Sequence, residues 1–300
     1  MQILDGKKTA AYYRSQIAKK IEQLTKTGAP PPRLAAFLIG DDNASAMYIK
    51  MKEKACAEAG ILNRTHILNV RTPEAEIIKL IDAENADAQT AGILVQLPLP
   101  KHYDEKKILS HIDPAKDADC FLPQNIGHMF LGEETTVIPC TPLGVMKLLK
   151  FYKIDVASKE VCIIGRSNIV GKPLAYLMLK QNATVTICHS KTRDLKGVAS
   201  RADILVAAIG RAKMIDASYV KEGAVVIDVG INRVETAGGG YETCGDCDFE
   251  SVSKKASYIT PVPGGVGPMT IAMLLYNTLY NYVLMKKVDL DMNIEAEDCL

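Results

Sequence analysis

The segment from Val161 to Pro173, VCIIGRSNIVGKP, contains small residues at a spacing typical of dinucleotide-binding sites. A short apolar run ends at Gly165, and a helix-like stretch begins at Gly171. At such a strand–turn–helix junction, glycines let the backbone approach a pyrophosphate at the helix N-terminus. Ser167 stands where the usual fingerprint has its middle glycine. We therefore predict a dinucleotide site at this turn, built on an imperfect fingerprint.

The next apolar run, Thr184 to Cys188, indicates which dinucleotide is bound. Most NAD sites end this strand with an acidic residue that bonds the ribose hydroxyls. Here Ser190 follows the run, with Lys191 and Arg193 just beyond it. NADP differs from NAD by a phosphate on the 2′-hydroxyl of the ribose. The Ser190 hydroxyl, the two cations beside it and Arg166 of the glycine turn suit the binding of this phosphate. We therefore predict that the cofactor is NADP.

Tyr48 and Lys52 are four residues apart in a helix-like segment, so they share one face of the helix. They form either a catalytic pair or a surface pair in which the lysine stem covers the aromatic ring. Gln96 favours the catalytic pair, because it interrupts the apolar run ILVQLP at the end of a predicted strand. Open α/β sheets bind their ligands at such strand ends. The alternative is that Gln96 is a structural residue whose buried amide bonds a nearby loop.

Two further segments combine polar and conformationally special residues. KDADC contains Asp117 and Asp119, which either position a substrate or cap a turn. Near the C-terminus, TPVPGGVGPMT has three glycines within four residues, followed by Pro268 at a predicted helix start. Backbone amides at a helix start can hold a carboxylate or amide of a ligand. A tight turn before a buried helix would explain the same residues.

Apolar runs and helix-like segments alternate along the chain, which predicts parallel sheets covered by helices. The predicted strands cover residues 33–40, 92–100, 161–164, 184–188, 203–209, 224–229 and 258–260. The predicted helices cover residues 7–26, 44–59, 73–86, 141–152 and 268–287. The four apolar runs between residues 161 and 229 alternate with helix-like segments, which is typical of a doubly wound sheet. We expect an α/β protein with two domains, of which the second is Rossmann-type.

The length and composition exclude several classes of protein. The 300 residues suit two ordinary domains, and the contents of 48% hydrophobic and 24% charged residues are typical of globular proteins. A net charge of +1 gives no electrostatic case for nucleic acid or an anionic membrane as a partner. No apolar run has the length of a bilayer span, and the N-terminal segment lacks the apolar core of a signal peptide. We expect a cytoplasmic protein.

The cysteines do not change this expectation. Cys244 and Cys247 form a C-x-x-C pair among the eight cysteines of the chain. A zinc or redox site there is one interpretation, and an incidental pair in a loop is the other. A structural zinc normally needs a second pair of ligands, and the sequence offers no evident one. We therefore predict no bound metal.

Taken together and in order, the motifs resemble the bifunctional methylenetetrahydrofolate dehydrogenase/methenyltetrahydrofolate cyclohydrolase family. The resemblance covers almost the whole chain except the last dozen or so residues. It rests on ILDGKKTA, YIKMKEKACAEAGI, GILVQLPLP, IPCTP, GRSNIVGKP, ATVTICHSKT, VIDVGIN and ITPVPGGVGPMT. It implies oxidation of 5,10-methylenetetrahydrofolate with NADP, then hydrolysis to 10-formyltetrahydrofolate, in one-carbon metabolism that serves purine biosynthesis. It also implies a homodimer formed through the nucleotide domain.

The resemblance further implies a division of the chain and a set of residue roles. Residues 1–140 with about 268–300 would form the folate domain and residues 141–267 the NADP domain, with a cleft between them. Lys52 would be the catalytic lysine, Gln96 would tune it, Tyr48 would stack on the folate, and Asp119 would bind the pterin. Residues that would line the folate and nicotinamide cleft are Pro263, Gly264 and Gly265. Residues that would hold the cofactor are Gly165, Arg166, Ser167, Gly171, Ser190, Thr141 and Ile231.

The sequence departs from the family pattern at two positions. Cys120 stands where the family usually has glycine directly after the aspartate, and His128 replaces a common arginine or lysine. A side chain at residue 120 is expected to affect the loop that carries Asp119, and so the affinity for the pterin. Three alternatives remain: a dehydrogenase without hydrolysis, a two-domain NADP enzyme of the shikimate dehydrogenase type, and a non-catalytic NADP sensor.

Overall fold

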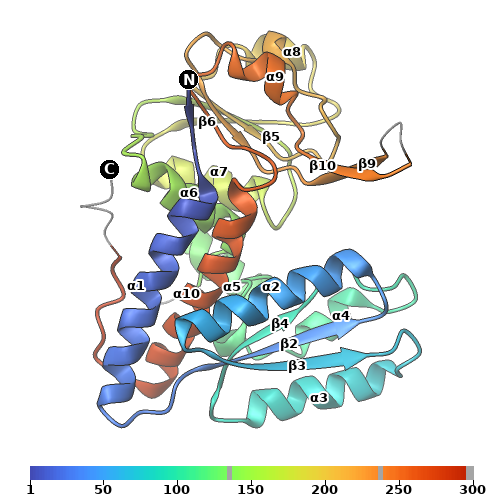
Figure 1. Cartoon of the computed structure of the whole chain (residues 1–300), viewed down its shortest axis with the longest axis vertical. Coiled ribbons are helices and arrows are strands. Elements are labelled where there is room, and N and C mark those ends of the chain that lie inside the picture. Colours follow the sequence, from blue (N-terminus) through green and yellow to red (C-terminus); the bar gives the residue numbers. More distant parts are fainter. Residues whose placement is uncertain (134–136, 236–238, 295–300) are drawn as a thin grey trace. The chain divides into compact units, whose positions relative to one another are not determined.

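The computed structural model describes residues 1–133, 137–235 and 239–294, apart from the side chains of Asn43 and Ala44 (Figure 1). The chain forms two compact units. The six-stranded unit comprises Met1–Ala10 and Thr141–Thr270. The three-stranded unit comprises Ala11–Cys140 and the segment that begins at Ile271. The long helices α1 (Gly6–Lys26) and α10 (Val266–Lys286) each contribute residues to both units.

Within the described residues, the six-stranded unit contains a parallel sheet in the order β1-β11-β8-β7-β5-β6. Its strands are β1 (Gln2–Ile3), β5 (Glu160–Ile164), β6 (Thr184–Cys188), β7 (Ile204–Ala207), β8 (Val225–Asp228) and β11 (Tyr258–Ile259). Its helical segments are α6 (Cys140–Phe151), α7 (Gly171–Lys180), α8 (Leu195–Ala199), η2 (Ala217–Tyr219) and α9 (Phe249–Ser253). An antiparallel pair, β9 (Asn232–Glu235) and β10 (Tyr241–Cys244), adds to it.

The strand order of this sheet places the glycine turn where a ligand is expected. The chain passes from β5 to β6 on one side and then to β7 on the other side of β5. Ligands of doubly wound sheets bind outside the carboxyl ends of the strands at such a switch point. Gly165 directly follows β5 and therefore lies at that point. The predicted doubly wound domain is confirmed.

The three-stranded unit has a parallel sheet in the order β3-β2-β4 among its described residues. Its strands are β2 (Arg33–Ile39), β3 (Leu62–Leu68) and β4 (Thr90–Val95). Its helical segments, besides α1 and α10, are α2 (Asn43–Ala59), α3 (Glu74–Ala86), α4 (Glu105–Ser110), η1 (Pro114–Lys116) and α5 (Pro123–Leu131). Central β2 is buried from Leu34 to Ile39, and its core cluster includes Ile77 and Ile81 of α3.

Helix α2, which carries Tyr48 and Lys52, is fixed at both ends. The Asp42 carboxylate accepts a hydrogen bond of 2.7 Å from the Ser45 amide, which satisfies a free donor of the first turn. At the other end, Gly60 adopts a left-handed backbone with φ of 76° and its amide bonds Ala57 O. Glycine adopts this conformation without steric cost. The predicted end of this helix at Gly60 is confirmed.

The first ten residues differ from the expected division of the chain, which assigned residues 1–140 to one domain. In the structure they cluster with the six-stranded unit. The reason is that Gln2 and Ile3 pair in parallel with Tyr258 and Ile259. In addition, the Lys7 amide donates a hydrogen bond of 3.1 Å to Gly264 O. No helix in the described ranges is long and apolar enough to cross a membrane.

Candidate active site

Lys52 is a buried lysine whose ammonium contacts a neutral amide. Its exposed fraction is 7%, and its Nζ donates a hydrogen bond of 2.9 Å to Oε1 of Gln96. Gln96 directly follows β4 and is itself held, because its backbone amide bonds Phe37 O and its Nε2 donates to Leu97 O. The interpretation of Lys52 as part of a surface pair is therefore wrong. Gln96 bonds its own loop, as one interpretation predicted, and it also bonds the lysine.

The surroundings of Lys52 shift its protonation equilibrium toward the neutral amine. Burial lowers the pKa of Lys52 below its ordinary value, because a low-dielectric environment disfavours the charged form. The carboxylate of Asp119 and the thiols of Cys140 and Cys56 oppose this shift. Burial is the larger effect, so a fraction of the amine is deprotonated at a lower pH than for a free lysine. A lowered pKa makes this amine easier to deprotonate than a free lysine, which is what a proton-transfer group requires.

Tyr48 lies one helical turn before Lys52 on the same face of α2 and is partly buried. Burial raises the pKa of its phenol, so the ring stays neutral at physiological pH. A neutral aromatic ring beside a lysine can stack on a flat ligand. The structure thus places Tyr48, Lys52 and Gln96 in one unit, and Gln96, which holds Lys52, directly follows the carboxyl end of β4.

The two aspartates of KDADC have different roles in the fold. Asp117 is 2% exposed, and its carboxylate accepts hydrogen bonds from the amides of Phe121 and Leu122 and from Nδ2 of Asn125. It therefore clamps the loop, as the turn-capping interpretation predicted. Asp119 is only partly buried and contributes to the electrostatic environment of Lys52. Of the two, Asp119 is the candidate ligand-binding residue.

The departure at Cys120 has a structural explanation. Its φ is +57°, which lies in the left-handed region, where glycine is normally preferred. A non-glycine residue in this conformation costs about 1–2 kcal/mol. The Cys120 side chain is fully buried, and its Sγ donates a hydrogen bond of 3.2 Å to Val137 O. The cysteine thus occupies the glycine position with its thiol hydrogen-bonded.

Two residues that support the Asp119 loop were not identified from the sequence. Asn277 of α10 donates from Nδ2 to Ala118 O and Ile138 O, each at 2.8 Å. The Cys140 thiol lies 3.3 Å from Ala118 O and also bonds Asp119. The sequence signal was an asparagine within a largely apolar helical segment. A buried amide needs partners, so such a residue marks a hydrogen-bonded position.

The glycine turn of the six-stranded unit is packed too closely for side chains. A Cβ on Gly165 would lie 2.2 Å from Ala208 O, and one on Gly171 would lie 2.2 Å from Gly165 O. Ser167 Oγ accepts hydrogen bonds from the amides of Val170 and Gly171, at 3.1 and 3.3 Å. Ser167 thus orders the turn at the start of α7. A bare backbone at a helix N-terminus fits a pyrophosphate, so these residues fit a dinucleotide.

The loop after β6 presents the predicted phosphate-binding residues. The His189 amide donates to Thr192 Oγ1 at 2.8 Å, and the Lys191 amide donates to His189 Nδ1 at 3.1 Å. These bonds order the backbone around Ser190. The side chains of Ser190 and of Arg166 are exposed, and neither has a polar partner within the described parts of the chain. Both are therefore available to an anionic ligand.

The remaining predicted residues also lie in the six-stranded unit. Thr141 Oγ1 is 3.0 Å from Thr270 Oγ1, and Ile231 is 53% exposed. Pro263 is exposed, whereas Gly264 and Gly265 are buried. Pro263 and its two glycines thus belong to a different unit from Tyr48 and Asp119.

The C-x-x-C segment has a structural role in the fold. Cys244 and Cys247 are free and buried, and the amide of Cys247 donates to the Asp228 carboxylate at 2.8 Å. Gly245 packs so closely that a Cβ would lie 1.9 Å from Asp228 Oδ2. Asp246 accepts hydrogen bonds from the amides of residues 209–211 and from Asn232. The segment therefore fixes the loops that follow β7 and β8.

Comparison with known proteins agrees with this geometry. Residues 4–119 match the catalytic domain, and residues 139–286 the NAD(P)-binding domain, of tetrahydrofolate dehydrogenase/cyclohydrolase. The bifunctional protein FolD of Bacillus subtilis is 52% identical, over 92% of this chain and 96% of its own. The solved structure of bifunctional FolD methylenetetrahydrofolate dehydrogenase/cyclohydrolase from Campylobacter jejuni is 48% identical, with a TM-score of 0.89 and coverage of 94% and 98%.

A third relative has been solved with its cofactor bound. The structure of the Trypanosoma brucei methylenetetrahydrofolate dehydrogenase-cyclohydrolase, complexed with NADP and an inhibitor, is 35% identical with a TM-score of 0.90. The alignment covers 95% of this chain and 98% of that protein. Both family domains and the relatives span nearly the full length of the chain. The chain therefore belongs to the tetrahydrofolate dehydrogenase/cyclohydrolase family.

Proposed function

We propose that this protein oxidises 5,10-methylenetetrahydrofolate with NADP and hydrolyses the resulting 5,10-methenyltetrahydrofolate to 10-formyltetrahydrofolate. The observation that carries the proposal is the buried Lys52 bonded to the neutral amide of Gln96. A dehydrogenase alone has no use for a proton-transferring amine of this kind. The names of the Bacillus subtilis and Campylobacter jejuni relatives, which describe bifunctional proteins, support the same conclusion.

The oxidation step needs alignment more than it needs acid–base chemistry. NADP, when bound, accepts a hydride from a carbon whose two neighbouring nitrogens stabilise the developing cation. The protein contributes the turn at Gly165 and Gly171 for the pyrophosphate and the exposed Arg166 and Ser190 for the 2′-phosphate. We propose that Thr141 and Ile231 lie near the nicotinamide, and that Pro263 to Gly265 line the path to the substrate.

The hydrolysis step needs a proton acceptor close to the attacking water. Lys52 serves here because burial lowers its pKa, and the positive charge of the methenyl substrate beside it would lower it further. The Gln96 carbonyl orients the amine, and the Tyr48 ring stacks on the substrate. Asp119 pairs with the pterin nitrogens, on a loop that Asp117 clamps. An arginine would not replace Lys52, because its charge is effectively permanent.

Substitution of Gln96 by glutamate tests the protonation state of Lys52. The carboxylate in Gln96→Glu would lie near the 2.9 Å position of the present amide oxygen. An opposite charge at this distance favours the ammonium and raises a lysine pKa by about 1–3 units. The pH at which the hydrolysis rate increases should therefore be higher in the variant than in the native protein. At pH 7 the rate of the variant should be lower than the native rate by roughly tenfold or more. A pH profile of methenyltetrahydrofolate hydrolysis measures this, and an unshifted profile contradicts the role of the neutral amine.

Substitution of Arg166 tests the preference for NADP. Arg166→Ala should raise the KM for NADP roughly tenfold or more, because an arginine–phosphate contact is charge-assisted, and change the KM for NAD much less. Steady-state oxidation of methylenetetrahydrofolate with each cofactor measures both constants. Lys172→Ala is a suitable control, since that exposed lysine already bonds Asn168 in the same turn. Equal changes for both cofactors would show that Arg166 does not contact the 2′-phosphate.

We further propose that the protein is a cytoplasmic homodimer joined through the six-stranded unit. Strand β6 lies at the edge of its sheet, and Ile187 on that strand is 40% exposed, which suits pairing with a second copy. The seven described cysteines are free thiols, which fits a reducing compartment. The shikimate-type and sensor hypotheses are not favoured, because relatives that match nearly the whole chain are bifunctional folate enzymes.

A further inference from the structure

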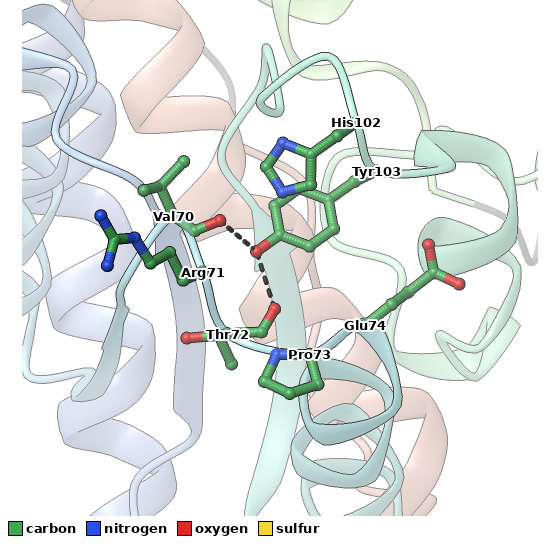
Figure 2. A pocket seen from close by; sticks show the side chains of 7 residues that line it. All are labelled: Val70, Arg71, Thr72, Pro73, Glu74, His102 and Tyr103. Carbon is green, nitrogen blue, oxygen red and sulfur yellow. Dashed lines mark hydrogen bonds between the residues drawn. The ribbon is translucent and has the colours of Figure 1, made fainter.

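Two cavities of the three-stranded unit differ in how the polar groups of their walls are satisfied. In the cavity between the loops that follow β3 and β4, the Tyr103 hydroxyl lies 2.9 Å from Val70 O and 2.8 Å from Thr72 O (Figure 2). A second cavity, of about 330 Å³, lies between η1, α5 and α10, and we call it the α10 cavity. Its lining includes Pro114, Asn125, His128, Val137, Asn281 and Leu284.

The α10 cavity contains a buried amide that lacks a hydrogen bond. Asn281 is 3% exposed, and its Nδ2 has no hydrogen-bond partner in the described parts of the chain. Folded proteins seldom leave a buried donor unpaired, because its desolvation lowers their stability. Since Asn281 lines the cavity, a ligand there can accept the missing hydrogen bond.

The rest of the wall determines which kind of ligand fits. Val137, Leu284 and Met285 supply apolar surface. At the rim, Nδ1 of His128 lies 2.6 Å from the Glu133 carboxylate, which therefore already has a partner. Neither lysine nor arginine is among the described residues that line the cavity. The wall suits an uncharged ligand, and an aromatic ring with a hydrogen-bond acceptor matches both the methionine sulfur and the buried amide.

Hydrogen bonds within the protein hold the walls of the α10 cavity in place. Asn125 of α5 donates from Nδ2 to Pro114 O at 2.9 Å, which joins α5 to η1. Gly132 ends α5 in a left-handed conformation with φ of 79°, and the Glu133 amide then bonds His128 O at 3.1 Å. The cavity is therefore preformed, and a preformed site loses less conformational entropy on binding.

The α10 cavity adjoins both supports of the loop that carries Asp119. Asn125 also donates from Nδ2 to Asp117 Oδ2 at 3.0 Å, and Asp117 clamps that loop. Asn281 lies one turn after Asn277 on the same face of α10, and Asn277 donates to a carbonyl of the loop at 2.8 Å. A ligand held by Asn125 and Asn281 should therefore stabilise the loop as well.

We propose that the α10 cavity is an effector site for a small, uncharged aromatic heterocycle that accepts a hydrogen bond from Asn281. Occupation of the cavity stabilises the Asp119 loop and so strengthens pterin binding by preorganisation. The binding step stands on the cavity itself, whereas the effect on the pterin rests on the proposed function. The lining residues are distinct from Tyr48, Lys52 and Gln96, so the ligand acts from outside the catalytic group.

Quinoline is the probe, because it is flat, uncharged near neutral pH and accepts a hydrogen bond at its ring nitrogen. Protein labelled with ¹⁵N-asparagine is titrated with quinoline, and the side-chain amide signals are followed by NMR. The Asn281 signal, identified by its absence in Asn281→Leu, should shift saturably with a Kd on the order of 1 mM. The signal of exposed Asn63, whose Nδ2 donates to Thr65 Oγ1 at 2.8 Å, should stay in place. An Asn281 signal that does not respond would overturn the site.

The effector role is tested by the KM for hydrolysis of methenyltetrahydrofolate, measured with and without quinoline. Quinoline should lower this KM roughly fivefold in the native protein, the lower end of typical coupling between two sites. The response should vanish in Asn281→Leu, which has no amide to donate. An unchanged KM in the native protein would overturn the effector role. A response that persists in Asn281→Leu would place quinoline elsewhere and overturn it as well.

Asn63→Leu is the matched control, since it makes the same change at an exposed residue of the same unit that does not line the cavity. It should keep the native response to quinoline. A thermal melt shows whether Asn281→Leu is folded, and its melting temperature should be about 2–6 °C above the native value because the unpaired donor is gone. Absence of hydrolysis in native protein without quinoline would overturn the proposed function, and the NMR titration would still decide whether the cavity binds the probe.

Discussion

Lys52→Met should lower the rate of methenyltetrahydrofolate hydrolysis by about 10²–10⁴-fold, the usual contribution of a positioned acid–base group, while oxidation remains measurable. Methionine fills the buried space of a residue that is 7% exposed, so the fold should tolerate it. It has no proton to exchange and cannot bond the Gln96 oxygen at 2.9 Å. The oxidation does not pass a proton through this amine. The two activities should therefore separate.

The control for this variant is Lys50→Met, on the same helix. Lys50 is exposed and lies two residues from Lys52, so it faces another direction. Both activities should stay near the wild-type values in the control. Assays of NADP reduction and of the loss of the methenyl chromophore, on the same preparations, give the comparison. Equal loss of both activities in a folded, folate-binding Lys52→Met protein would rule out the role assigned to the lysine.

Gly171→Ala should produce the opposite separation: oxidation should need more NADP, and hydrolysis should be kept. The added Cβ would lie 2.2 Å from Gly165 O and 3.0 Å from Arg166 Cα, which forces the start of α7 away from the turn. Overpacking of this kind costs about 1–3 kcal/mol, or roughly five- to 150-fold in the affinity for NADP. Lys52, Gln96, Tyr48 and Asp119 belong to the three-stranded unit, so hydrolysis should persist.

Gly127→Ala is the matched control for this variant. A Cβ on Gly127 meets nothing within 4 Å, and the residue lies inside α5. An NADP titration of the oxidation rate and a thermal melt separate weaker cofactor binding from a loss of stability. Continued hydrolysis in Gly171→Ala shows that the folate site is intact. Unchanged affinity for NADP in this variant would mean that the turn is not the pyrophosphate site.

Much of the fold could be predicted from the sequence, because alternating apolar runs and helical periods report local structure. The runs 161–164, 184–188 and 258–260 correspond to β5, β6 and β11. Strand β3 was missed because its sequence, LNRTHIL, is polar and largely exposed at the edge of the sheet. The pairing of β1 with β11 was also missed, since it joins residues about 256 positions apart in the chain. Such long-range pairing leaves no local signal.

The site was only partly predictable for a related reason. The spacing of Tyr48 and Lys52 is also compatible with a surface pair, and only the tertiary burial of Lys52 excludes that alternative. The support of the Asp119 loop comes from Asn277, which lies more than 150 residues away in the sequence. The left-handed backbone of Cys120 is likewise a property of the folded loop. Local pattern identifies candidate groups, whereas burial and hydrogen bonding determine their chemistry.

The most direct test of the central claim is a spectrophotometric assay of the purified native protein. Methylenetetrahydrofolate is supplied with NADP and, separately, with NAD, and methenyltetrahydrofolate is then supplied alone. We expect oxidation that prefers NADP, and loss of the methenyl chromophore that needs no cofactor. Oxidation without hydrolysis would contradict the role of Lys52 and Gln96. A folded protein that binds NADP but acts on neither folate would contradict the proposed function.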